Sequence, residues 1–377
     1  MFRNLILGSP VSSRLFTAAS KSKWQISQRL APLASRVIVK RPLTVNHKKL
    51  SDVSVTKPIF TEEERKKVAA DRLKQLEPYV SKLPEKWIPY AELMRLDKPA
   101  GTWYLFLPSA WAIMLAGFEL VSPISQTLYI LGLFGIGSIV MRGAGCTIND
   151  ILDKNFDDKV IRTIERPIAS GRVSKTNATK FLVAQLTVGL GVLLSLPLDC
   201  FLLGASSLSL VLTYPLFKRF TYYPQVALSA CFNWGTLLGF AAMGDWNWGL
   251  MLPLYFATFN WCMIYDTIYA HQDKLWDVKA GVKSTALKWG ANTKNICYGL
   301  ASLQVSSLAF MGVYGALGPG FWIAGTIFSY RMINMIKRTN LDSIKSCWEA
   351  FNINVTSAKI FTVGILVDYI LRLFGFI

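Results

Sequence analysis

The stretch Arg142-Gly-Ala-Gly-Cys-Thr-Ile-Asn149-Asp150-Ile-Leu-Asp153-Lys-Asn-Phe-Asp157 ends a run of apolar residues long enough to cross a membrane. Asp150, Asp153 and Asp157 stand at i, i+3 and i+7, so a helix places all three on one face, and Asn149 lies one turn behind Asp153. Carboxylates this close repel one another unless a cation joins them, and oxygen ligands of this kind suit Mg2+. The stretch therefore predicts a membrane helix that ends in a magnesium site.

Acidic runs just past a membrane helix are also typical of solvated residues at headgroup level that have no chemical role. Two features favour a site here. Arg142 lies inside the apolar segment, on the side of the helix that carries Asn149 and Asp153, and an ionisable residue within a span indicates function. A second acidic string, which also follows an apolar segment, consists of Asp266, Asp273 and Asp277.

The composition is that of a polytopic membrane protein. The chain has 377 residues, of which 52% are hydrophobic and only 17% charged, whereas a soluble chain of this length carries more surface charge. Its six cysteines are scattered singly without a CxxC pair, and it has two histidines. A zinc site and a disulfide framework are therefore not indicated.

The N-terminal region is basic and divides into two parts. Residues 1–50 contain ten Lys and Arg and no Asp or Glu, which predicts a mitochondrial transit peptide. Nucleic-acid binding is disfavoured, because nothing aromatic or ordered accompanies the basic residues. Residues 51–86 are expected to form a polar linker and a surface helix, which Thr61 and Glu64 begin as a capping box and Pro84 ends.

Residues 87–377 are expected to form an all-α, polytopic membrane bundle of about nine helices around a central cavity. The predicted spans are 101–119, 125–148, 177–196, 199–216, 225–243, 248–269, 294–316, 319–336 and 357–376. In the last span, Asp368 and Arg372 are four residues apart and are expected to neutralise each other.

The distribution of charge over the loops predicts the orientation of these spans. Loops after even-numbered spans are rich in Lys and Arg, whereas loops after odd-numbered spans carry only Glu119, Asp199 and Asp245. The positive-inside rule then places both acidic strings and the N-terminus on one face. In the mitochondrial inner membrane this face is the matrix side.

Two carboxylate strings beside Arg and Lys, on one face of a membrane, suit a diphosphate substrate. Carboxylates hold Mg2+, Mg2+ holds phosphate oxygens, and cationic side chains bind the remaining charge. Such a site makes diphosphate a better leaving group. A long hydrocarbon on the substrate explains the membrane location, so the pattern predicts ionisation of a prenyl diphosphate and transfer to a nucleophile.

The same residues carry a family resemblance over about Trp87 to the C-terminus. Asn149-Asp150-x-x-Asp153-x-x-x-Asp157, followed by Arg162-Thr-x-x-Arg166-Pro, resembles the first signature of the UbiA superfamily of intramembrane prenyltransferases. Tyr265-Asp266-Thr-Ile-Tyr-Ala-His-Gln-Asp273-Lys-x-x-Asp277 resembles the second signature. The sequence of this second motif is most similar to that of the members that attach a polyprenyl group to 4-hydroxybenzoate in ubiquinone synthesis. Leu96-Asp-Lys98-Pro and Tyr214-Pro-x-x-Lys218-Arg also resemble that subgroup.

The resemblance implies roles for individual residues. It assigns Mg2+ and diphosphate binding to Asn149, Asp150, Asp153, Asp157, Asp273 and Asp277, and phosphate contacts to Arg142, Arg162, Arg166 and Lys218. It implies that Arg95 or Lys98 holds the carboxylate of the aromatic acceptor and that Tyr214 contributes to substrate binding. The reaction also calls for a base that assists proton loss from the ring, and Asp266 is the candidate. Asp150, Asp153, Asp266 and Asp273 are then the expected catalytic residues. The expected partners are polyprenyl diphosphate, 4-hydroxybenzoate and the lipid bilayer, and association with other proteins of ubiquinone synthesis is left open.

Two alternatives remain at this point. Another aromatic acceptor, such as homogentisate, a naphthoate or haem, is compatible with the motifs, because the acceptor is chosen by the shape of the pocket. A membrane cation carrier also uses carboxylates within membranes, but it commonly places them in mid-span. The chain departs from the subgroup at Leu275-Trp276, where further acidic residues are frequent, so the second metal site is expected to be less negative.

Overall fold

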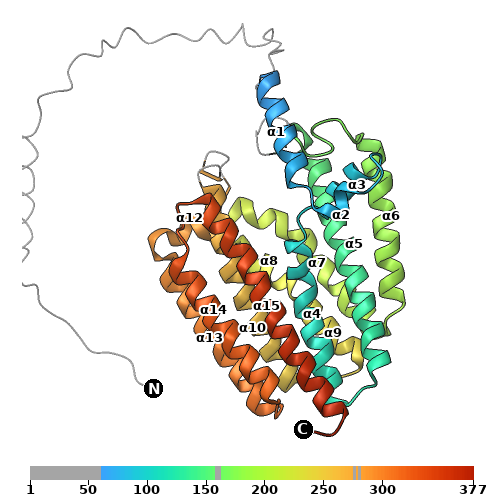
Figure 1. Ribbon diagram of the computed structural model, residues 1–377, viewed down its shortest axis with the longest axis vertical. Coiled ribbons are helices and arrows are strands. Elements are labelled where there is room, and N and C mark those ends of the chain that lie inside the picture. The colour runs from blue at the N-terminus through green and yellow to red at the C-terminus, as the bar shows by residue number, and fades with distance from the viewer. Residues whose placement is uncertain (1–60, 158–162, 275–276, 279–281) are drawn as a thin grey trace, which may run out of the picture. The chain divides into compact units, whose positions relative to one another are not determined.

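The computed structural model describes residues 61–157, 163–274, 277–278 and 282–377, and within helices it leaves the side chains of Arg65, Gln75, Asn155, Phe156, Val211, Leu212, Tyr214, Pro215, Leu216, Lys218 and Arg219 undescribed. The described residues are helical or irregular, and none lies in a strand. Figure 1 shows long helices packed side by side, with a group of short N-terminal helices at one end. The predicted all-α class is confirmed. The predicted transit peptide of residues 1–50 lies outside the described residues.

The N-terminal helices are α1 (Glu62–Gln75), α2 (Pro78–Ser81) and α3 (Ile88–Leu93). The capping box at Thr61 and Glu64 is confirmed, since Thr61 Oγ1 accepts from Glu64 N and Glu64 Oε2 accepts from Thr61 N. The prediction of one helix reaching Pro84 is wrong. Pro78 begins a new helix and forces the residue before it out of the helical region, so α1 ends with Leu76 as its extended C-cap.

The long helices occur at the predicted places. They are α4 (Ala100–Glu119), α5 (Ile124–Asp157), α6 (Lys175–Leu194), α7 (Leu198–Phe220), α8 (Pro224–Phe232), α9 (Trp234–Met243), α10 (Trp248–Ala270), α13 (Thr293–Tyr314), α14 (Pro319–Arg338) and α15 (Ile344–Leu373). The fifth predicted span is divided at Asn233 into α8 and α9. Two helices extend well beyond the predicted spans, α5 at its C-terminal end and α15 at its N-terminal end.

Among the described residues, six stretches are long and apolar enough to cross a membrane. They are Ala100–Glu119, Ile124–Lys154, Lys175–Leu194, Pro224–Met243, Thr285–Tyr314 and Ile344–Leu373. Helices α7, α10 and α14 form where spans were predicted but fall outside this set. In α10 and α14, polar residues such as Asn260 and Arg331 lower the hydropathy. The bundle is therefore confirmed, while nine crossings and a central cavity stay predictions.

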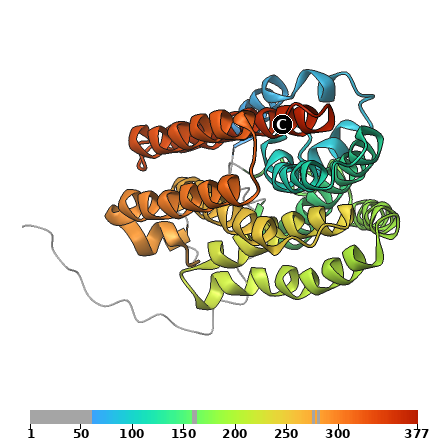
Figure 2. The ribbon, with the colours of Figure 1, turned by 90° about the horizontal axis from the view of Figure 1, so that it is seen from below.

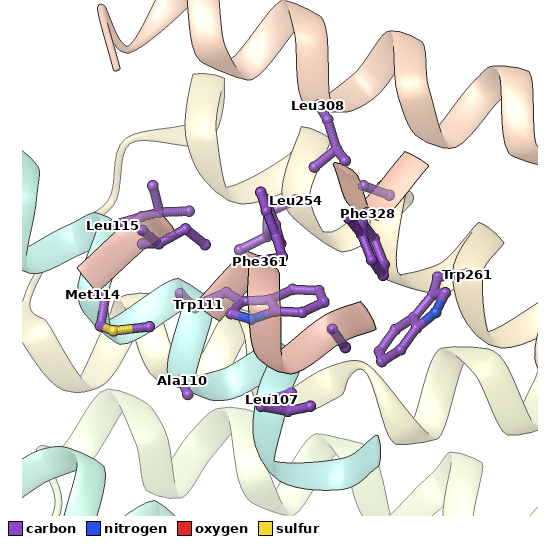
Figure 3. Close-up of a cluster of buried hydrophobic side chains, with 14 of the residues drawn as sticks. Leu107, Ala110, Trp111, Met114, Leu115, Leu254, Trp261, Leu308, Phe328 and Phe361 are labelled. Atoms are coloured by element: carbon purple, nitrogen blue, oxygen red, sulfur yellow. The ribbon is translucent and has the colours of Figure 1, made fainter. Parts of the chain in front are cut away.

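The centre of the bundle is filled by large aromatic side chains from four helices. The Trp111 ring of α4 lies 5.4 Å from Trp261 of α10, 5.8 Å from Phe328 of α14 and 5.0 Å from Phe361 of α15, measured between centroids (Figure 3). All four residues are buried. Seen from below, α15 lies on one side of the bundle and α7 on the other, with α4 and α10 between them (Figure 2). The aromatic core therefore fixes α4 and α10 against each other, and α10 carries the candidate site residue Asp266 near its C-terminal end.

The expected pair of Asp368 and Arg372 is wrong. Asp368 is buried and accepts hydrogen bonds from Gly320 N at 2.8 Å and Phe321 N at 2.7 Å, at the start of α14. The Arg372 guanidinium instead lies over the Phe118 ring and donates to the Ile377 carbonyl. The free N–H groups at the first turn of α14 attract the carboxylate, because they are otherwise unpaired and carry the positive end of the helix dipole.

Successive long helices run in alternating directions, so the two acidic strings lie at one end of the bundle. The C-terminal ends of α5 and α10, with the helix α12 (Thr285–Trp289), lie at the end that carries the N-terminal helices, opposite the C-terminus (Figure 1). The loop that contains Asp245, between α9 and α10, lies at the other end.

Candidate active site

Arg142 is held between α5 and the beginning of α4. A Cβ placed on Gly101 would lie 2.6 Å from Arg142 Nε and 2.9 Å from Arg142 Nη2. Only a glycine therefore leaves room for the guanidinium at this contact. Arg142 Nε is buried without a hydrogen-bond partner, so the side chain keeps donor capacity for an anionic ligand.

Asp150 lies at the centre of the described ion pairs. Its side chain is fully buried, and its Oδ1 accepts from Arg95 Nη2 at 2.6 Å and lies 3.4 Å from Arg166 Nη1. Arg166 Nη1 also donates to both oxygens of Asp157, at 3.0 and 2.8 Å. Two arginines from segments outside α5 therefore neutralise the two buried carboxylates of the first string.

Arg95 occupies a backbone conformation that usually belongs to glycine. Its φ is +57°, and it follows α3 in a Schellman turn, in which Leu96 N donates to Ala91 O and Arg95 N donates to Glu92 O. A left-handed conformation costs a residue other than glycine about 1–2 kcal/mol. Strain of this kind is commonly retained where a side chain has a function, and here it accompanies the contact of Arg95 with Asp150.

Asp157 is buried at the end of α5. Burial raises the pKa of its carboxyl, and Arg166 opposes this shift. The Asp157 carbonyl also accepts from Thr163 Oγ1 at 3.0 Å, which joins the helix end to the following segment. Arg166 therefore favours the charged form of this carboxyl, which burial disfavours.

The prediction that Asp150, Asp153 and Asp157 share one environment is only partly correct. Asp150 and Asp157 are buried on Arg166, whereas Asp153 is exposed, as is Asn149 one turn before it. The i, i+4 spacing places Asn149 and Asp153 together on the accessible side of α5, because packing against the N-terminal segment buries the side that carries Asp150.

These residues offer the oxygen donors that a hard divalent cation prefers. Asp150 Oδ2 is buried and has no hydrogen-bond partner, and Asn149 and Asp153 present further oxygens nearby along the helix. No three acidic, histidine or cysteine side chains in the described part of the chain are gathered closely enough to hold a metal ion. The donor types fit Mg2+, but the buried carboxylates are occupied by arginines in this arrangement.

The second string lies at the end of α10. Asp266 is on α10, Asp273 is on the short helix η2 (His271–Asp273), and Asp277 follows; all three are half-buried and interact with other groups. His271 is buried, and its Nε2 pairs with Thr293 Oγ1 at 3.1 Å. Burial and Lys274 lower the pKa of His271 to about 4, so the ring is neutral at physiological pH and anchors this turn to α13.

Several predicted site residues have no described side-chain geometry. Arg162 and Leu275-Trp276 lie outside the described residues, and Tyr214 and Lys218 lie on α7 with undescribed side chains. Lys98 is 53% exposed, and its Nζ lies 4.0 Å from Asp97 Oδ2. Of the two candidates for the acceptor carboxylate, Arg95 therefore faces the first string, whereas Lys98 is largely exposed.

A group of charged residues beside the first string was not predicted from the motifs. Glu92 of α3 is buried and contacts Arg72 of α1 and Arg172 of the segment after α5. The available signal was the single acidic residue in the otherwise uncharged stretch Ile88-Pro-Tyr-Ala-Glu92-Leu93, since a glutamate in such a helix is rarely buried without partners.

The fold and the site together define a membrane-embedded helical enzyme with its arginine- and carboxylate-rich centre at one end of the bundle. Residues 105–360 match the model of the UbiA prenyltransferase family. The chain belongs to this family, as the two signatures predicted.

Relatives extend over most of the chain. It is 56% identical over 322 residues to the mitochondrial 4-hydroxybenzoate polyprenyltransferase of Saccharomyces cerevisiae, covering 85% of this chain and 87% of that protein. It is 46% identical over 289 residues to the human protein of the same name, covering 76% and 77%. With its apolar helices, the chain is thus a mitochondrial membrane protein.

The fold is also shared with solved structures. A UbiA homologue from Aeropyrum pernix K1 has a TM-score of 0.60 at 23% identity, covering 70% of this chain and 97% of that one. A UbiA homologue from Archaeoglobus fulgidus, whose structure contains GPP and Mg2+, has a TM-score of 0.51 at 16% identity, covering 74% and 99%. At these identities the likeness supports the helical fold.

Proposed function

We propose that this chain transfers the polyprenyl group of polyprenyl diphosphate to the ring of 4-hydroxybenzoate, ortho to the hydroxyl, in ubiquinone synthesis. The observation that carries the chemistry is the Asp150–Arg95 and Asp157–Arg166 network at the end of α5, on the same end of the bundle as the C-terminal end of α10, which Asp273 and Asp277 follow in the chain. The choice of acceptor is supported by the names of the relatives that cover most of the chain.

The carboxylate strings are proposed to hold the cofactor. Asn149, Asp150, Asp153 and Asp157 would hold one Mg2+, and Asp273 and Asp277 would hold another. Bound Mg2+ supplies positive charge that stabilises the leaving diphosphate. Mg2+ in the Archaeoglobus structure is consistent with this choice of metal.

The cations of the chain bind the remaining phosphate charge. Arg142, Arg166, Arg162 and Lys218 are proposed to take this role. The C–O bond of the allylic diphosphate breaks with its electron pair leaving on diphosphate. A ring carbon of the acceptor then forms the new C–C bond, and Asp266 takes the ring proton. Tyr214 and either Arg95 or Lys98 are proposed to orient the acceptor through its ring and carboxylate.

The active site is proposed to open on the matrix side of the inner mitochondrial membrane. Its supports are the basic loops at the end of the bundle that carries both strings and the mitochondrial names of the relatives. Association with other proteins of ubiquinone synthesis stays an expectation from the resemblance.

A competition experiment tests this function. Purified protein in lipid nanodiscs receives a polyprenyl diphosphate, Mg2+ and an equal mixture of 4-hydroxybenzoate, homogentisate and a naphthoate, and mass spectrometry identifies the products. We expect prenylated 4-hydroxybenzoate and stoichiometric diphosphate. A predominant product from another acceptor would replace the acceptor in this proposal, and absence of any prenylated product would contradict it.

A further inference from the structure

Glu92 links three parts of the chain that are distant in sequence. Its carboxylate accepts from Arg72 Nη1 of α1 at 3.0 and 3.1 Å and also from Arg172 Nη1. Its side chain is only 6% exposed, whereas both arginines are partly exposed. The same two arginines also contact Glu165. Arg72 Nε lies 3.6 Å from the Glu165 carboxylate, and Arg172 Nη2 donates to the Glu165 carbonyl. This cluster thus fastens the N-terminal helices to the segment that follows α5.

Both ends of this cluster continue into the candidate active site. On one side, Arg95 Nη1 donates to the Glu92 carbonyl at 2.8 Å, and Arg95 Nη2 reaches Asp150. On the other side, Arg166 follows Glu165 directly and binds Asp150 and Asp157. The positions of both arginines on the first carboxylate string therefore depend on how α3 and the segment 163–173 are joined.

We propose that Glu92 is a positioning residue for the first metal and diphosphate site, and that α1–α3 form part of the catalytic unit. This inference rests on the proposed function. A buried carboxylate shared by two arginines fixes its partners strongly, because removing its charge leaves Arg172 without a carboxylate and Arg72 with only that of Glu165 at 3.6 Å. The segment 163–173 would then shift, and Arg166 would lose its alignment with Asp150 and Asp157.

The test compares Glu92→Gln with Glu92→Asp and Arg172→Gln in full-length protein in nanodiscs. The matched control is Glu349→Gln, which removes an exposed carboxylate that lies 3.8 Å from Lys345. Calorimetry measures binding of geranyl diphosphate in the presence of Mg2+, and kinetics give KM for each substrate and kcat. Apparent unfolding midpoints are measured on the same samples.

We expect Glu92→Gln to weaken binding of geranyl diphosphate with Mg2+ by about tenfold or more, as loss of an outer-shell partner does at metal sites. The KM for 4-hydroxybenzoate should change less than the affinity for geranyl diphosphate, because Arg95 is held through the Glu92 backbone carbonyl, which the substitution keeps. Glu92→Asp should recover most of the binding. Arg172→Gln should reproduce the defect, and the double variant should be no worse than either single variant, because both act through one contact.

A Glu92→Gln protein with a lower unfolding midpoint but unchanged binding of geranyl diphosphate would show that Glu92 has only a structural role. This result would overturn the present inference and leave the proposed function standing. Additive defects in the double variant would do the same. If Glu92→Gln does not accumulate, Arg172→Lys, which keeps the charge but loses the planar fork, is expected to show the same weakening. The calorimetry needs no acceptor, so the test remains valid even if the enzyme prenylates an acceptor other than 4-hydroxybenzoate. Wild-type protein that does not bind geranyl diphosphate with Mg2+ would contradict both proposals.

Discussion

The guanidinium of Arg142 packs against the backbone of Gly101, so that α4 and α5 meet at a cation near the start of α4. This arrangement ties the one arginine inside the apolar part of α5 to the first turn of α4. The position of Arg142, a candidate contact for the phosphates of the substrate, therefore depends on the absence of a side chain at Gly101 in the other helix.

Gly101→Ala should therefore impair substrate binding without unfolding the protein. The added Cβ would lie 2.6 Å from Arg142 Nε, so the guanidinium must move, while alanine is favoured over glycine in a helix. We expect the KM for prenyl diphosphate to rise between about tenfold and a hundredfold, since small displacements of positioning groups have effects of this size. Gly132→Ala is the control, because its Cβ would meet no atom within 4 Å.

Arg142→Ala should raise the KM for prenyl diphosphate and leave the KM for the acceptor nearly unchanged. An equal effect on both substrates, or loss of folded protein, would instead identify Arg142 as a structural residue. Normal kinetics of Gly101→Ala would show that the position of Arg142 is unimportant for binding.

Asp153→Ala and Asp273→Ala should each lower kcat about a hundredfold to a thousandfold, since removal of one charge-stabilising contact at an active site has this effect. Asp153 is exposed, so the fold should persist. The double variant should lose less than the product of the two effects, because the strings act on one leaving group. Activity should vanish in EDTA and return with Mg2+; robust turnover in chelator would contradict the metal-dependent site.

Asp368→Ala should destabilise the protein, because it removes the acceptor for Gly320 N and Phe321 N. Loss of a helix cap costs about 0.5–2 kcal/mol, and the measurement is the apparent unfolding midpoint in detergent. Arg372→Gln serves as the comparison and should have a smaller effect. Equal destabilisation by the two changes would indicate that Asp368 and Arg372 pair after all.

Asp245→Asn should stabilise the protein at neutral pH. Burial raises the pKa of the Asp245 carboxyl, Asn247 N–H opposes the shift, and Glu119 adds to it. Since the folded pKa exceeds the unfolded one, the ionised carboxylate destabilises the fold above the folded pKa, and this penalty disappears below about pH 3.9. The variant should show a higher unfolding midpoint at pH 7 and converge with wild type near pH 4, whereas the exposed Asp71→Asn should not. A gain independent of pH would contradict this explanation.

Single cysteines at Lys274 and Trp246 should be labelled from opposite sides of the inner membrane. The two positions lie at opposite ends of the bundle, and the loop charges predict that Lys274 faces the matrix. Five native cysteines are buried and Cys231 is half-buried, so Cys231→Ser provides a quiet background. Labelling of both positions from one side in mitoplasts would overturn the orientation.

Local sequence patterns determined the positions of the long helices, the helix that carries the first carboxylate string, and the capping box of α1. Runs of apolar residues predicted where the long helices lie, because a chain in lipid pairs its backbone groups within a helix and exposes apolar side chains to the hydrocarbon. The spacing of Asn149, Asp150, Asp153 and Asp157 predicted that α5 carries a string of oxygen donors. The capping box at Thr61 was also readable, since both of its partners lie within one turn.

Only the tertiary structure decided which charges meet. Arg95 and Asp150 are 55 residues apart, and Glu92 and Arg172 are 80 apart, so no helical period links them. Periodicity predicted that Asp150 and Asp153 lie near each other on α5, but packing of the N-terminal helices buried Asp150 and left Asp153 exposed. Likewise, Asp368 caps α14 rather than pairing with Arg372, because the unpaired N–H groups of a neighbouring helix attract it more strongly than a cation on its own helix.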